Sequence, residues 1–190
     1  LRGEDASAVS LEIAADPPSH GERAPAGGGL KVTVRRADNM ADSGQPIPPD
    51  GISLAEGATQ GTALPSLLAT SWRVHPSERL GQVCLSFSAS HDEGFHGFGE
   101  RFNALDQRGK VVDSRVFEQY LSQGTRSYIP IPFFLSSRGY SFFADTVRWS
   151  EFDLCSADPK RWSWCGELDE SESIELRFDA GSPTDRKSVV

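Results

Sequence analysis

Residues 94–145 read GFHGFGERFNALDQRGKVVDSRVFEQYLSQGTRSYIPIPFFLSSRGYSFFAD, and this stretch decides the fold. It opens with an aromatic run punctuated by glycines, residues 95–99, and it ends in two apolar runs, residues 128–135 and 140–144. The apolar runs flank Ser136–Gly139, and two strand-like runs joined by a short connection containing glycine are typical of a β-hairpin. The stretch therefore predicts two strands, a long polar loop and a hairpin.

Short segments outside this stretch alternate apolar and polar residues, which is the two-residue period of a half-buried strand. They are Val9–Ile13, Leu30–Arg35, Ser71–Val74, Gln82–Ser88, Val147–Leu154, Arg161–Trp164 and Ile174–Phe178. No window of helical length follows the helical period, so we predict an all-β chain folded as an antiparallel β-sandwich. Two segments stay open, because Ile52–Leu54 fits a short strand and Leu64–Ala69 fits a helical turn.

The composition limits the classes of function. The chain has 190 residues and a formal net charge of −8, which argues against non-specific binding to nucleic acid or to an anionic membrane surface. No apolar run is long enough for a transmembrane helix. A (β/α)8 barrel typically needs about 250 residues, so one cannot fit here beside a second domain. We expect no nucleic-acid partner and no membrane partner.

The central stretch resembles a known family. The segments GFGERFNAL (residues 97–105), Arg108-Gly109 and YIPIPFFLSSRGYSFF (residues 128–143) occur in this order. Together they resemble the N-terminal β-domain of glycoside hydrolase family 31, which includes α-glucosidases and α-xylosidases. The likeness covers residues 95–154, and it implies a galactose-mutarotase-like supersandwich, a more particular fold than strand periodicity alone predicts.

The resemblance implies a division of labour between two domains. Residues 1–181 are expected to form the N-terminal β-sandwich domain of a glycoside hydrolase, and residues 182–190 a tail or cut end. In family 31 both catalytic aspartates lie in a (β/α)8 barrel that follows this domain, and we expect this chain to lack that barrel. We therefore carry over no catalytic residue. We predict an accessory domain that packs on its own C-terminal barrel and meets an α-glycoside through the full-length enzyme.

One loop carries the predicted contribution to sugar binding. In family 31 a loop of the β-domain reaches over the mouth of the barrel, and here it corresponds to about Val112 to Ser127. Relatives often carry a Trp-Asn-x-Asp-like stretch there, which this chain replaces by Arg115–Tyr120. Carboxylates and amides hydrogen-bond to sugar hydroxyls, and aromatic faces pack on pyranose rings. The candidate substrate-binding residues are Asp113, Phe117, Glu118, Gln119 and Tyr120.

The same stretch also has structural interpretations. Glu100 and Arg101 are expected to pair with neighbours at a strand end, and ordinary loop packing is the alternative for Phe117 and Tyr120. The loop is rich in polar residues and buries too little apolar area to offset its ordering entropy, about 1–2 kcal/mol per residue. We therefore expect it to stand away from the sandwich and to be mobile in the isolated domain.

Two other functions stay open, a free-standing carbohydrate-binding β-sandwich and a mutarotase-like sugar epimerase. An epimerase needs a general acid and base, usually including histidine. The four histidines, His20, His75, His91 and His96, show neither a suggestive pair nor the spacing of metal ligands. We expect no metal and no cofactor.

The three cysteines and the tryptophan pair allow predictions about disulfide bonding and burial. The odd number of cysteines favours free thiols in a reducing, cytoplasmic compartment, and a Cys155–Cys165 bridge across a hairpin is the alternative. Trp162 and Trp164 share one face of an extended segment. That face is expected in the core or at a domain interface, where the indoles would belong to an exposed apolar patch, and a carbohydrate-binding platform is the alternative.

Overall fold

The computed structural model of the protein describes residues 8–16, 29–37, 50–54, 64–74, 80–118, 121–169 and 173–180. These residues form twelve strands and no α-helix. The strands are β1 (Ala8–Asp16), β2 (Gly29–Ala37), β3 (Ile52–Ser53), β4 (Ser66–Val74), β5 (Leu80–Ser88), β6 (Phe95–Gly99), β7 (Lys110–Asp113), β8 (Pro130–Ser136), β9 (Tyr140–Asp145), β10 (Ser150–Leu154), β11 (Arg161–Asp169) and β12 (Ser173–Ala180). Across the described part of the chain, no helix has the length and apolarity needed to cross a membrane.

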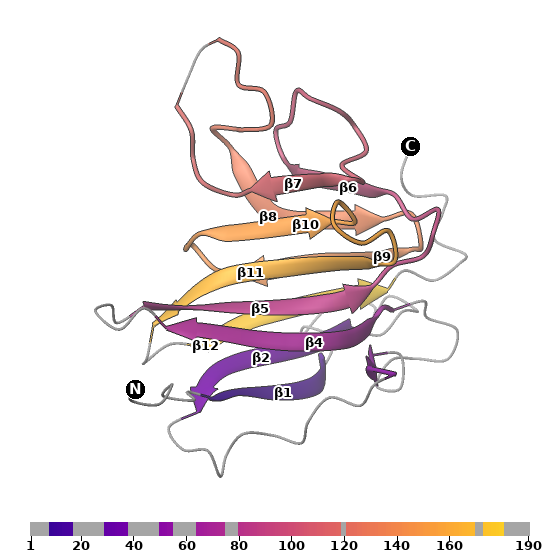
Figure 1. Cartoon of the computed structure of the whole chain (residues 1–190), viewed down its shortest axis with the longest axis vertical. Helices are drawn as coiled ribbons and strands as arrows, with labels where there is room; N and C mark the ends of the chain where they lie inside the picture. The colour runs from indigo at the N-terminus through magenta and orange to yellow at the C-terminus, as the bar shows by residue number, and fades with distance from the viewer. Residues whose placement is uncertain are drawn as a thin grey trace, which may run out of the picture.

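The strands form two six-stranded sheets packed as a sandwich (Figure 1). One sheet has the order β1-β2-β12-β9-β8-β6, and the other has the order β3-β4-β5-β11-β10-β7. Every ladder between these strands is antiparallel. The predicted all-β antiparallel sandwich is therefore confirmed, and so is the hairpin, which joins β8 to β9 through residues 137–139.

Aromatic side chains fill the space between the sheets. Phe134 on β8 lies at the centre of the cluster. Its ring is stacked 5.4 Å from that of Phe98 and 5.5 Å from that of Phe142, and it meets Trp162 edge-on at 5.1 Å. All four side chains are fully buried. Such pairs add about 0.5–1.5 kcal/mol each beyond the burial of their area, so this cluster ties one sheet to the other.

The two-residue period identifies most strands correctly. On β5 the predicted inward face, Val83, Leu85 and Phe87, is completely buried. The helical turn considered for Leu64–Ala69 is wrong, because most of that segment lies in strand β4 and Leu67 is a Cα partner of Phe87 on β5. The register shifts between Leu67 and Ala69, and this irregularity interrupts the alternation by which a strand is recognised.

Of the two locations expected for Trp162 and Trp164, the core is confirmed and the exposed interface patch is wrong. Both residues lie on one face of β11, as predicted, but that face points into the sandwich and both indoles are completely buried. Trp162 stacks on Phe87 with ring centroids 4.3 Å apart. Strand β11 has β5 on one side and β10 on the other, so it is an interior strand whose inner face belongs to the core.

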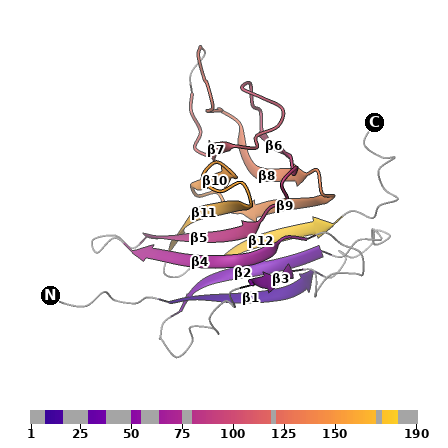
Figure 2. The same ribbon diagram turned by 45° about the vertical axis from the view of Figure 1, so that its right-hand side comes forward.

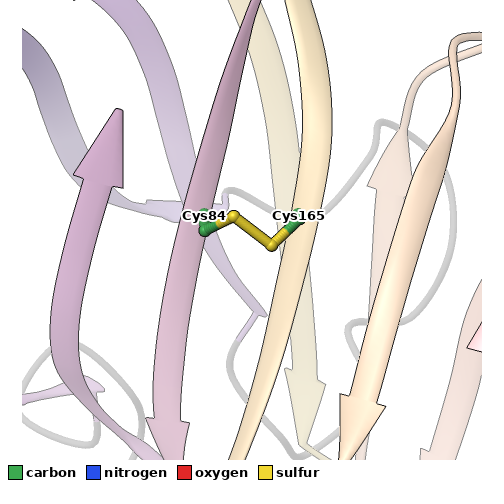
Figure 3. Close-up of a disulfide and its surroundings, with 2 residues drawn as sticks. All are labelled: Cys84 and Cys165. Carbon is green, nitrogen blue, oxygen red and sulfur yellow. A yellow bond between two sulfur atoms is a disulfide. The ribbon is translucent and has the colours of Figure 1, made fainter. Parts of the chain in front are cut away.

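The cysteines pair differently from either expectation. Cys84 on β5 and Cys165 on β11 are directly opposite in the ladder, with Cα atoms 4.1 Å apart, and they form a disulfide (Figure 3). The buried free thiol is Cys155. The prediction of free thiols is therefore wrong for two of the three cysteines, and so is the Cys155–Cys165 bridge. The partners are 81 residues apart, and only the pairing of β5 with β11 brings them together.

Candidate functional site

Two connections rise from one end of the sandwich and enclose a cleft. Strands β6 and β8 belong to one sheet and β7 to the other, so the β6–β7 connection (residues 100–109) and the β7–β8 connection (residues 114–129) both cross between the sheets. Figure 2 shows the two connections beside each other above the strands. The cleft has a volume of about 890 Å³ and is lined by Glu100, Phe102, Asn103, Glu118, Ser122, Gln123, Gly124 and Tyr128.

The end of β6 aims the chain into this cleft. Gly97, Phe98 and Gly99 have φ angles of 135°, 68° and 79°, and the pairing of β6 with β8 shifts register across them. A Cβ atom on Gly99 would overlap the carbonyl oxygen of Ile129, so only glycine fits there. Phe98 anchors the turn by burying its ring in the core. The residue after the turn, Glu100, therefore leaves the sheet and lines the cleft.

Arg101 joins three segments of backbone behind the cleft. Its Nε donates to the carbonyl oxygen of Phe98 at 3.0 Å, its Nη1 to that of Thr125 at 2.7 Å and its Nη2 to that of Asp113 at 2.9 Å. These acceptors belong to the end of β6, the β7–β8 connection and the end of β7. The expected role of Arg101 at a strand end is confirmed, and it extends to the neighbouring connection.

The β6–β7 connection is held by its own polar side chains. Gln107 is buried and exchanges hydrogen bonds with Asn103 at 3.1 and 3.2 Å. The carboxylate of Asp106 accepts from the amides of Phe95 and Arg108. Burial alone would raise the pKa of Asp106, but these amide hydrogen bonds, with His96 and Lys110 nearby, lower it below its ordinary value. Asp106 therefore shapes the loop as a carboxylate.

Glu93, whose carboxyl group is buried, holds the segment before β6 next to the β6–β7 connection. Glu93 accepts from the Ser136 hydroxyl at 2.6 Å and from the Tyr140 hydroxyl at 2.5 Å, and its carbonyl oxygen accepts from Arg108 at 2.7 Å. Burial, together with the charge of Glu93, raises the pKa of Tyr140 well above its ordinary value. These contacts tie the start of β6 to the β8–β9 hairpin and steady the base of the cleft.

Asp113 lies at the end of β7, and its carboxylate has protein partners. It accepts from the Arg115 backbone amide at 2.7 Å, from the Arg115 Nε at 2.9 Å and from the Trp149 indole at 3.1 Å. Burial would raise the pKa of Asp113, but the hydrogen bonds and charge of Arg115 lower it. Asp113 is not among the residues that line the cleft. Its backbone carbonyl, which accepts from Arg101, is its link to the cleft wall.

The other candidates are distributed along the β7–β8 connection, which stands away from the sandwich as predicted (Figure 1). Glu118 is exposed and lines the cleft. Phe117 is half-buried and its ring lies 4.3 Å from the Arg126 guanidinium, so it packs within the loop. Gln119 and Tyr120 lie outside the described residues.

Sequence reasoning missed several of the residues that line the cleft. Glu100 and Phe102 line the cleft from the β6–β7 connection, although pairing at a strand end is the role favoured for Glu100 from sequence, and Tyr128 lines it from the β7–β8 connection. The glycines at 97 and 99 are the partial signal in the sequence. The turn out of the sheet depends on positive φ angles at three consecutive residues, 97–99, and residue types alone do not show them.

The lining chemistry suits a neutral ligand rich in hydroxyl groups. Glu100 and Glu118 supply carboxylate acceptors, and Asn103 supplies an amide. Phe102 is 65% exposed and Tyr128 is 50% exposed, so both rings offer apolar faces. Among the described residues that line the cleft there is no lysine or arginine, and two carboxylates are present, which disfavours an anionic ligand. Groups of three or more metal-binding side chains are absent from the described residues.

Comparison with known proteins places the chain. Residues 35–153 match the family model of the glycosyl hydrolase 31 N-terminal galactose mutarotase-like domain. The chain belongs to this family. This glycosyl hydrolase 31 domain is 32% identical over 142 residues to an isomaltosyltransferase from Sporosarcina globispora, covering 75% of the chain. It is 48% identical over 58 residues to a 1,3-α-isomaltosidase from Kribbella flavida, covering 27% of the chain.

Solved structures share the fold of the domain. A Listeria monocytogenes protein in complex with α- and β-D-glucose aligns with a TM-score of 0.56 and 19% identity, over 92% of this chain and 21% of that chain. A cycloalternan-degrading enzyme from Trueperella pyogenes in complex with cycloalternan aligns with a TM-score of 0.52 and 24% identity, over 83% of this chain and 23% of that chain. The chain spans only 13% and 8% of the two curated relatives.

Proposed function

We propose that this glycosyl hydrolase 31 domain is the N-terminal accessory domain of an α-glycosidase, formed by residues 1–181. It packs on a following (β/α)8 catalytic barrel and lends its β7–β8 connection to the barrel's sugar-binding site. The observation that carries the proposal is the cleft, because its two loops present carboxylates, amides and exposed rings at one end of the sandwich. The names of the relatives, an isomaltosyltransferase and a 1,3-α-isomaltosidase, support an α-glycoside as the ligand.

Exposed apolar side chains, most of them on the two connections that form the cleft, support a partner domain. Among the described residues, the large hydrophobic side chains that remain exposed all fall between positions 102 and 147. They are Phe102, Leu105, Val111, Val116, Leu121, Tyr128, Ile129, Ile131, Leu135 and Val147. Large exposed apolar surface marks interfaces. A barrel seated there would cover this surface and would close the cleft over a bound sugar.

Glu118 is the residue of the β7–β8 connection that we expect to contact the sugar directly. Its carboxylate is exposed and lines the cleft, so it can accept hydrogen bonds from sugar hydroxyls. Loss of one hydrogen bond to a charged group costs about 1.5–3 kcal/mol, which is about ten- to hundred-fold in affinity. Loops held on a rigid scaffold are where recognition residues gather, and this loop is held by strands β7 and β8.

Binding of a carbohydrate by the domain alone is a second candidate function. The observation that favours it is that loops of this domain form the cleft without help from another domain. The length of the natural reading frame separates the two functions. A frame that continues for several hundred residues with alternating strands and helices supports the accessory domain, and a frame that ends with the sandwich supports the binding module.

The decisive experiment is steady-state kinetics of the natural full-length protein carrying Glu118→Ala, on isomaltose and on an aryl α-glucoside. We expect a ten- to hundred-fold loss of kcat/KM on at least one substrate, with unchanged folding. Glu12→Ala is the matched control, since Glu12 is an exposed glutamate on β1, at the far edge of its sheet. Unchanged kinetics with Glu118→Ala on every accepted substrate would reduce the loop to a connector.

The 190-residue chain by itself is expected to hydrolyse no α-glycoside, because no catalytic residue is carried over to it. Glycoside hydrolysis needs an acid and a nucleophile or base on either side of one bond. Turnover of an aryl α-glucoside by the purified chain, abolished by Glu100→Gln or Glu118→Gln, would contradict the accessory role and place an active site in the cleft.

A further inference from the structure

Arg101 lies between the two walls of the cleft without lining it. Its neighbours in sequence, Glu100 and Phe102, both line the cleft on the side of the β6–β7 connection. Thr125, whose carbonyl oxygen accepts from Arg101 at 2.7 Å, directly follows Gly124, which lines the cleft on the side of the β7–β8 connection. One side chain therefore joins the two walls from behind.

The geometry of the guanidinium explains why arginine occupies this position. Arginine presents five N–H donors in a rigid planar fork, and Arg101 directs three of them to backbone carbonyls on three segments. The ion pairs between described residues do not include Arg101, so its charge strengthens hydrogen bonds to neutral acceptors. A lysine ammonium is a compact point charge and cannot span three carbonyls arranged in this way.

Electrostatics keep this side chain charged although it is half-buried. Burial lowers the pKa of Arg101, and the negative charge of Asp113 opposes that change. Asp113 itself is held as a carboxylate by Arg115 and Trp149. A charged arginine donates stronger hydrogen bonds than a neutral group would, so the three links to the backbone persist at neutral pH.

The β7–β8 connection has internal contacts that let it move as a unit. Val116 and Ser127 form an isolated bridge between its two limbs, and the Phe117 amide donates to the Ser127 carbonyl at 2.9 Å. Arg126 covers the ring of Phe117. These contacts shape the loop but do not fix its position relative to the β6–β7 connection. The Glu100 amide donates to the Ile129 carbonyl at 3.1 Å and links the two connections next to β8, and the hydrogen bond from Arg101 to Thr125 links them at a second point.

We propose that Arg101 is a positioning residue that sets the width of the cleft by tying the β7–β8 connection to the end of β6. The tie holds Glu118 at a set distance from Glu100 and Phe102, so it selects ligands by size without touching them. The selection of ligands rests on the proposed function. The fixed separation of the two walls does not, and it can be measured without a ligand.

The experiment measures the separation of the walls in the 190-residue chain by double electron–electron resonance. Nitroxide labels are placed on Leu105→Cys and Leu121→Cys, whose side chains are 84% and 77% exposed, one on each connection. Cys155 is buried and is expected to stay unlabelled. We expect a narrow distance distribution in the parent and a distribution at least twice as broad with Arg101→Lys. Arg115→Lys is the matched control, because Arg115 is exposed on the β7–β8 connection and pairs with the Asp113 side chain, and it should leave the width unchanged.

Hydrogen exchange supplies a second readout. With Arg101→Lys or Arg101→Met, the Glu100 amide, which donates to the Ile129 carbonyl on the other connection, should exchange about ten- to hundred-fold faster, while the amides of β9 and β12 keep their rates. Unchanged distances and unchanged exchange in both variants would overturn the proposal. Global unfolding of both variants would also overturn it, because Arg101 would then serve the whole fold. Altered wall separation with unchanged sugar binding would leave the tie in place and overturn its role in selecting ligands.

Discussion

The interior of the sandwich and the loop end of the same molecule are built by different means. In the interior, rings from both sheets surround Phe134. Stability there comes from the burial of apolar area, and the hydrophobic effect is non-directional. At the loop end, directed hydrogen bonds to backbone carbonyls, such as those of Arg101, hold exposed segments in place. The difference indicates that stability and recognition can be altered separately, since they depend on separate residues.

The largest expected effect is on the interior. Phe134→Ala removes a ring that packs against both sheets, and a buried Phe→Ala change typically costs about 3–5 kcal/mol. Chemical denaturation of the 190-residue chain measures the loss as a shift of the midpoint. The neighbouring Leu135→Ala is the control, because Leu135 points outward and is 48% exposed. Equal losses in the two variants would contradict the distinction between interior and surface on β8.

An intermediate effect is expected where the two regions meet. Gly99→Ala combines a positive φ of 79° with a Cβ that overlaps the Ile129 carbonyl, so we expect a loss of about 1–3 kcal/mol and displacement of the β7–β8 connection. Gly139→Ala is the control, with a φ of 86° but open space around its Cβ, and should cost about 1 kcal/mol from backbone conformation alone. A Gly99→Ala variant no less stable than Gly139→Ala would show that close approach does not fix this turn.

The smallest effect is expected at high pH. Burial, and to a lesser extent nearby carboxylates such as Glu93, raises the pKa of Cys155 from its ordinary 9.0 to about 11, despite the opposing charge of Arg108. Because the folded pKa exceeds the unfolded one, the contribution of Cys155 to stability is complete below pH 9 and is lost as the pH rises to about 11. The Cys155→Ser variant should lack this contribution to the loss of stability at high pH.

Denaturation midpoints of parent and Cys155→Ser at pH 9 and at pH 11 test this expectation. Tyr140 also has a raised pKa and destabilises both proteins at high pH, so the difference between the two proteins is the quantity to read. A difference that stays constant across the interval would mean that the thiol is accessible to water in the folded chain.

Sequence reasoning predicted the sandwich well because its signal is repeated. Each strand of an antiparallel sheet with one buried face must alternate apolar and polar residues. The pattern of β5 alone therefore predicted that Val83, Leu85 and Phe87 face the core. The same local rule could not identify the partner of a strand. It therefore failed for Cys84, which meets Cys165 across a ladder, and for Trp162, whose burial depends on β11 lying inside its sheet.

The site could be predicted only in part, for a related reason. The family resemblance, together with polar composition, located the β7–β8 connection and included Glu118, which lines the cleft. It could not show that Glu100 faces the same cleft, because that depends on three successive residues with positive φ at the end of β6. Composition also could not show that Arg101 donates to Thr125, because the acceptor is a backbone carbonyl, which every residue type has.

The disulfide has a consequence for how the chain acquires its bonds. Cys155 and Cys165 are ten residues apart, whereas the native partners are 81 apart. In a disordered chain, closing the shorter loop is favoured by about 2 kcal/mol of chain entropy. Oxidation before folding should therefore favour a non-native Cys155–Cys165 disulfide. The native bond would then form only when the Cys84 thiolate attacks the Cys165 sulfur and releases the Cys155 thiolate. Oxidation after β5 and β11 have paired leads directly to the native bond, so refolding yield should depend on the order in which denaturant and reductant are withdrawn.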